Sequence, residues 1–85
     1  MPSSIAELVR SAPDWSTADP RSPNVKAWLA RAYRAVYEID PLEAGVLRVH
    51  AQYLHKDSRR HSAEIAETLR RVVQKLAHRS SPETL

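Results

Sequence analysis

The segment over residues 40–57, DPLEAGVLRVHAQYLHKD, carries apolar side chains on two separate faces of a helix. One face is a stripe spaced by four, three and four residues, made of Leu42, Val46, Val49 and Tyr53. The other face lies about 120° away around the helix and is made of Leu47, Ala51 and Leu54. A helix that is apolar on two faces needs two neighbours. We therefore expect it to be the middle layer of a domain, between helices over residues 25–39 and 65–76.

The amino-acid composition favours helices throughout. The 85 residues include one Gly and no Phe, which argues against strands joined by tight turns. Ala, Leu, Arg and Glu, which favour helices, are abundant. The sequence predicts an all-α fold, a small helical bundle of three principal helices plus a short N-terminal helix. We expect a short helix and a Pro-rich loop over residues 1–23, a helical core domain over residues 24–79, and a disordered tail over residues 80–85.

The connection between the central and the last helix has two interpretations. Residues 55–62, HKDSRRHS, contain neither Pro nor Gly, so one continuous helical rod is the first interpretation. The apolar stripes before and after this segment are out of register by two residues, which favours a turn near residues 57–62 and an antiparallel hairpin. Within the central helix, Gly45 is unfavourable relative to Ala. We expect either the close approach of another helix backbone at that position or simple tolerance.

Two segments near the N-terminus also have alternative placements. Ile5, Leu8 and Val9 give the residues before Pro13 the pattern of a short amphipathic helix, which either docks on the core or frays. The loop over residues 13–23 contains three prolines and no periodic pattern. A buried indole of Trp15 would pin this loop, whereas an exposed one would indicate an N-terminal arm.

Several kinds of chemistry lack the residues they need in this chain. There is no Cys, which removes disulfides, thiolate metal sites and thiol nucleophiles. Glycine-rich phosphate loops, nucleophile motifs and cofactor fingerprints are absent, and the histidine spacings do not predict a metal site. We therefore expect no enzyme, no cofactor, no metal and no small-molecule substrate. Without a long hydrophobic run, we expect a cytoplasmic protein with no membrane partner.

His50 is predicted to project between the two apolar faces of the central helix. Glu43 and Asp57 each lie seven residues away, on nearly the same side. His50, Glu43 and Asp57 are a candidate pH-sensitive cluster, because a nearby carboxylate favours the protonated form of an imidazole. A catalytic histidine is the least favoured alternative, and a histidine at the core edge with satisfied hydrogen bonds is the plainest one.

The basic residues are unevenly distributed. Residues 1–43 carry a net charge of −1, residues 44–79 carry +5 and Glu83 adds −1, which gives the total of +3. Candidate phosphate-binding residues are Arg59, Arg60, Arg70, Arg71, Lys75 and Arg79. They define an alternative function, that of a dimeric nucleic-acid-binding protein. Glu64 and Glu67 interrupt the basic residues, so solvated surface charge is the competing interpretation.

The function that we expect is that of a small intracellular interaction or regulatory module acting through helix-face association. We expect the apolar surface of the central and last helices to be only partly covered within a single chain. The candidate protein-interaction residues are Leu47, Leu54, Ile65, Leu69, Val72, Val73 and Leu76. A second copy would complete the core, so the expected partner is the chain itself, as a homodimer, or another protein.

Overall fold

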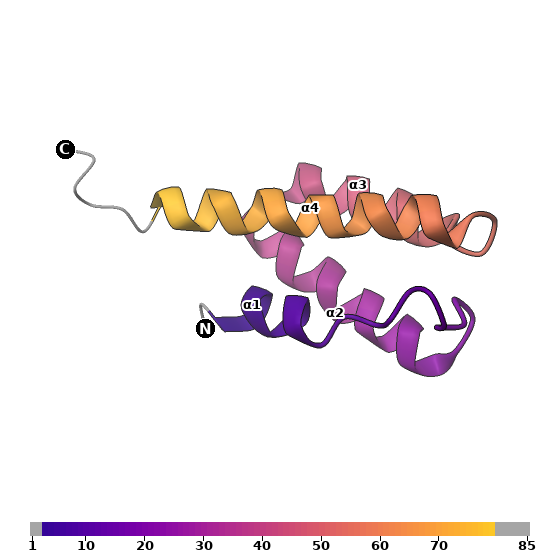
Figure 1. Cartoon of the computed structure of the whole chain (residues 1–85). Coiled ribbons are helices and arrows are strands. Elements are labelled where there is room, and N and C mark those ends of the chain that lie inside the picture. Colours follow the sequence, from indigo (N-terminus) through magenta and orange to yellow (C-terminus); the bar gives the residue numbers. More distant parts are fainter. Residues whose placement is uncertain (1–2, 80–85) are drawn as a thin grey trace.

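The computed structural model describes residues 3–79, and within this range the chain forms four helices and no strand (Figure 1). The helices are α1 (Ser3–Arg10), α2 (Pro23–Ile39), α3 (Pro41–Gln52) and α4 (Ser58–Arg79). The predicted all-α fold is therefore confirmed, whereas the predicted tail over residues 80–85 lies outside the described residues. No helix in the described part combines the length and the apolarity needed to cross a membrane.

A single residue, Asp40, separates α2 from α3. Its extended backbone, with φ −153° and ψ 99°, ends α2. Its Oδ1 atom accepts a hydrogen bond from the N–H of Leu42 at 3.0 Å and so caps α3, with Pro41 at the first helical position. The start of α2 is built in the same way, because Ser22 Oγ accepts from the N–H of Val25 at 3.2 Å ahead of a proline. The cap and the proline thus place both helix starts.

The short N-terminal helix docks on the core. Ile5 and Leu8 of α1 are buried, whereas Val9 is half-exposed. The Nε1–H of Trp28 in α2 donates a hydrogen bond to the Leu8 carbonyl at 3.1 Å. Trp15 packs edge-on against Trp28 with ring centres 5.9 Å apart and is partly buried. The docked alternative therefore holds for α1, and Trp15 pins the loop that follows it.

All four helices contribute to one core. Its fully buried apolar residues are Ile5, Leu8, Val25, Trp28, Ala32, Val36, Ala44, Leu47, Leu54, Ile65, Leu69 and Val72. The core thus includes residues of α1, which the sequence assigned to a separate N-terminal segment. Packing by α1 gives this small bundle more buried surface than the three long helices could provide alone.

α3 contacts both α2 and α4, but only one of its two apolar faces is covered. α2 and α4 also contact each other, so both lie on the same side of α3 and pack against Ala44 and Leu47. The stripe made of Leu42, Val46, Val49 and Tyr53 faces away from them and is exposed. The expectation that each apolar face of α3 has its own neighbour in the chain is therefore wrong.

The turn between α3 and α4 lies over residues 53–57, earlier than the predicted position at residues 57–62. Leu54 anchors it in the core, because its side chain is 1% exposed. Asp57 Oδ1 accepts a hydrogen bond from the N–H of Arg60 at 3.3 Å and caps the first turn of α4. This cap starts α4 at Ser58, within the segment in which the turn was predicted, and the turn before it excludes the continuous rod.

Candidate functional site

Most of the predicted interaction residues are buried within a single chain. Those with at most 3% exposure are Leu47, Leu54, Ile65, Leu69 and Val72. Of the other two, Val73 is 40% exposed and Leu76 is partly buried against the core. α1 contacts α4 as well as α2, so it helps to cover this surface. The expectation of incomplete coverage is therefore wrong for these five residues.

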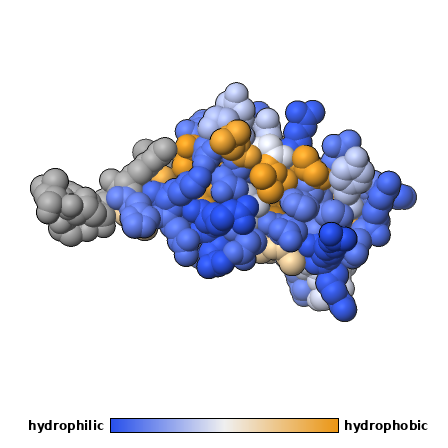
Figure 2. Space-filling view, turned by 90° about the horizontal axis from the view of Figure 1, so that it is seen from above, coloured by the Kyte–Doolittle hydropathy of each residue, from blue (hydrophilic) through white to orange (hydrophobic). Residues whose placement is uncertain are grey.

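The opposite face of α3 carries four of the exposed large apolar side chains of the described residues. We call it the outer stripe, and its members are Leu42, Val46, Val49 and Tyr53. Their exposed fractions are 83%, 38%, 51% and 40%, respectively. Figure 2, which views the molecule from above, shows apolar residues gathered in a band on this side. Exposed apolar side chains that lie together, rather than scattered singly, are typical of a contact surface.

Three ion pairs join the start of α3 to the second half of α4. Glu43 pairs with Arg71 through two parallel hydrogen bonds, Nε to Oε2 at 3.0 Å and Nη2 to Oε1 at 2.9 Å. Lys75 pairs with Asp40, and its Nζ atom also lies 3.8 Å from Glu43 Oε2. The Arg71 guanidinium holds the pKa of Glu43 below its ordinary value, and the Lys75 ammonium likewise lowers the pKa of Asp40. Both acids beside the outer stripe are thus neutralised within the chain.

A histidine pair joins the other end of α3 to α4. The Nδ1 atoms of His50 and His61 lie 2.9 Å apart, so one imidazole donates a hydrogen bond and the other accepts it. The Tyr53 ring lies 6.3 Å from the His61 ring, and Lys56 Nζ lies 5.3 Å from the centre of the Tyr53 ring. As positions along α3 rise from 40 to 50, their partners in α4 fall from 75 to 61. These contacts therefore run in opposite directions along the two helices.

The predicted cluster of His50, Glu43 and Asp57 does not form. Glu43 binds Arg71 and Asp57 caps α4, so within residues 3–79 neither carboxylate pairs with His50. Sequence reasoning missed His61 because the predicted turn contained it. With the turn at residues 53–57, His50 and His61 stand at nearly equal distances from its middle. The described residues hold no group of three or more His, Asp or Glu that could bind a metal ion.

The six predicted phosphate-binding residues do not form one free basic surface. Arg70 pairs with Glu67, and Arg71 and Lys75 pair with the acids at the start of α3. Arg59 and Arg60 are exposed in the first turn of α4. The side chain of Arg79 lies outside the described part of the chain. Half of the set is therefore engaged in ion pairs within the bundle.

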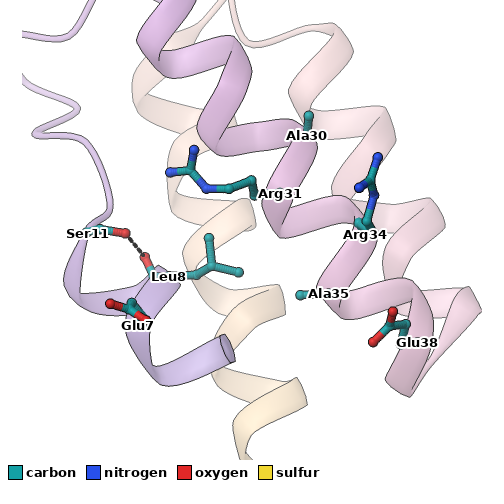
Figure 3. Close-up of a pocket in the computed structure, with 8 residues that line it drawn as sticks. All are labelled: Glu7, Leu8, Ser11, Ala30, Arg31, Arg34, Ala35 and Glu38. Carbon is teal, nitrogen blue, oxygen red and sulfur yellow. Dashed lines mark hydrogen bonds between the residues drawn. The ribbon is translucent and has the colours of Figure 1, made fainter. Parts of the chain in front are cut away.

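A groove of about 660 Å³ lies between α1 and α2 (Figure 3). Arg31 reaches across it toward α1, whereas Arg34 points away from α1. Glu7 and Glu38 also belong to its lining, so the charges of the two arginines are balanced. This lining singles out no class of ligand.

No protein-family model matches the chain, and no curated protein or solved structure matches it at a significant level. A candidate function must therefore come from the geometry of the bundle itself. The outer stripe is distinguished from the other features because four of the seven exposed large apolar side chains of the described residues lie together on it.

Proposed function

We propose that this protein is a non-enzymatic interaction module that associates with a second copy of itself through the outer stripe of α3. The observation that carries the proposal is the exposure of four large apolar side chains along one helix face, up to 83% for Leu42. Burying that surface against a partner removes it from water and is favourable. A cytoplasmic, regulatory role is part of the proposal, and a chain without cysteine suits a reducing compartment.

The spacing of the outer stripe suits contact with another helix. Its steps of four, three and four residues match the seam through which paired helices interlock. The exposed parts of the four side chains add up to roughly 400 Å², about half of what each partner buries in an interface of standard size. The flanking polar residues would supply the remainder. We therefore expect a weak dimer whose population depends on protein concentration.

Sedimentation velocity over a range of about 5 to 500 µM tests the proposal. We expect the wild-type chain to shift from monomer toward dimer, and Val49→Asp to stay monomeric because it places a charge in the apolar seam. Val73→Asp is the matched control, because Val73 is a valine of similar exposure on α4. Circular dichroism checks that both variants stay folded. A wild-type chain that is monomeric throughout, or equal losses in the two variants, would contradict the proposal.

A second candidate function is nucleic-acid binding through the turn between α3 and α4. Its support is the exposure of Lys56, Arg59 and Arg60, which form no ion pair with another residue in the range 3–79. Clustered basic side chains of this kind contact phosphates. The pairing of Arg70, Arg71 and Lys75 with acids of the bundle makes this the weaker candidate.

A further inference from the structure

The only glycine of the chain lies in the middle of α3. Glycine is the least favourable residue in a helix interior after proline. A Cβ atom added to Gly45 would meet no atom within 4 Å, so no neighbouring backbone of the described chain requires the absence of a side chain. The backbone of Gly45 does not require glycine either, because its φ is not positive.

Gly45 borders the outer stripe. It lies next to Val46, three residues after Leu42 and four residues before Val49, and these spacings bring all four positions to neighbouring parts of the helix surface. The missing side chain therefore leaves a notch beside the exposed apolar residues. A second helix that packed on the stripe could bring its backbone close to α3 at this point, as small residues allow in tightly packed helix pairs.

We infer that the second copy packs its own α3 antiparallel across this face, with the two helices crossing between Val46 and Val49, beside Gly45. The inference rests on the proposed self-association. A twofold axis near the middle of the stripe would set Val46 of one copy against Val49 of the other, and Leu42 against Tyr53. Each large side chain of the outer stripe then meets an apolar partner, so the surface is complementary to itself.

The helix dipoles favour the antiparallel orientation. Asp40 and Glu43 at the start of α3 are already paired with Lys75 and Arg71 within the chain, so the dipole is the remaining electrostatic difference between the two orientations. A parallel pair would set like helix ends side by side. An antiparallel pair sets the start of each helix beside the end of the other and opposes the two dipoles favourably.

Gly45→Ala distinguishes an effect on the fold from an effect on the interface, because it should stabilise the monomer and weaken the dimer. In the monomer, measured at about 5 µM, the melting temperature should rise by about 4 to 8 °C, since alanine is the better helix former and meets no atom there. The dissociation constant of the dimer, measured by sedimentation, should increase about tenfold or more because the added methyl group holds the helices apart. Gln74→Ala, an exposed change on α4, is the control and should leave the dissociation constant unchanged.

Three outcomes are distinguishable. A more stable monomer with a weakened dimer supports a crossing close to Gly45. A dimer that forms with an unchanged or lower dissociation constant in Gly45→Ala overturns the crossing while the proposed self-association stands. A wild-type chain that forms no dimer overturns both.

The orientation has its own test, because the chain contains no cysteine and introduced thiols are unique reporters. Leu42→Cys and Tyr53→Cys chains are mixed in equal amounts and oxidised with diamide. The antiparallel arrangement predicts mostly disulfides between the two different variants. Disulfides mainly between identical variants would show a parallel arrangement and would contradict the inference.

Discussion

The two apolar faces of α3 have similar side chains and different surroundings. On the inner face, Ala44 and Leu47 are fully buried under α2 and α4. On the outer face, Leu42 and Val49 are more than half exposed. The difference arises because α2 and α4 touch each other and so share one side of α3. Periodicity alone locates apolar faces, but the mutual packing of the neighbours decides which face remains available to a partner.

The comparison predicts unequal effects for the same substitution on the two faces. Leu47→Ala should lower the free energy of unfolding by about 2 to 5 kcal/mol, because it opens a cavity at a fully buried site. Leu42→Ala should change it by no more than about 0.5 kcal/mol, because that side chain is 83% exposed. Urea unfolding at low protein concentration measures both values. Similar losses would show that the outer face is packed within the chain after all.

The stability that the ion pair between Glu43 and Arg71 contributes should decrease in acid. Since the pKa of folded Glu43 lies below its ordinary value of 4.5, the unfolded chain binds more protons in acid. The stability from its pairing with Arg71 is thus present at neutral pH and is lost as the pH falls below about 4.5. Glu43→Gln should therefore cost about 1 kcal/mol at pH 7 and progressively less in acid.

Urea unfolding of Glu43→Gln and wild type at pH 7 and pH 3 measures this convergence. Glu64→Gln is the control, because Glu64 is an exposed acid on α4. If Glu43→Gln lowered the free energy of unfolding as much at pH 3 as at pH 7, the charge of Glu43 would not be what stabilises its contact with Arg71.

The smallest expected effect is on the salt dependence of nucleic-acid binding. If the protein binds nucleic acid, its functional surface is the turn between α3 and α4 and not the outer stripe. If phosphates are contacted, Arg59→Gln should lower the slope of log affinity against log salt by about 1, measured with random-sequence duplex DNA. Arg70→Gln should leave the slope unchanged, because Arg70 pairs with Glu67. Binding that is absent at about 50 mM salt would remove this alternative, and equal effects of the two substitutions would contradict the role assigned to the turn.

The sequence predicted those parts of the fold that local chemistry specifies. The helices predicted over residues 25–39 and 65–76 lie within α2 and α4. The all-α class follows from composition and from the apolar spacing of α2 and α4. These signals act over a few residues, so they can be recognised without knowledge of the tertiary contacts.

The candidate site could not be predicted in the same way because it depends on contacts between distant segments. The burial of Leu69 and Val72 depends on a core that includes α1, which the spacing of Ile5 and Leu8 left free to dock or fray. The pairing of His50 with His61 depends on the position of the turn. The unfavourable position of Gly45 in a helix was visible in the sequence, but only the structure shows that no neighbouring helix of the described residues approaches it.

The most direct measurement is a dilution series of the wild-type chain, followed residue by residue in ¹⁵N–¹H correlation spectra from about 5 to 500 µM. Association through the outer stripe predicts shifts that depend on concentration at Leu42, Gly45, Val46 and Val49, with the resonances of α1 unchanged. Spectra that do not depend on concentration, or shifts confined to another face of the bundle, would contradict association through the outer stripe.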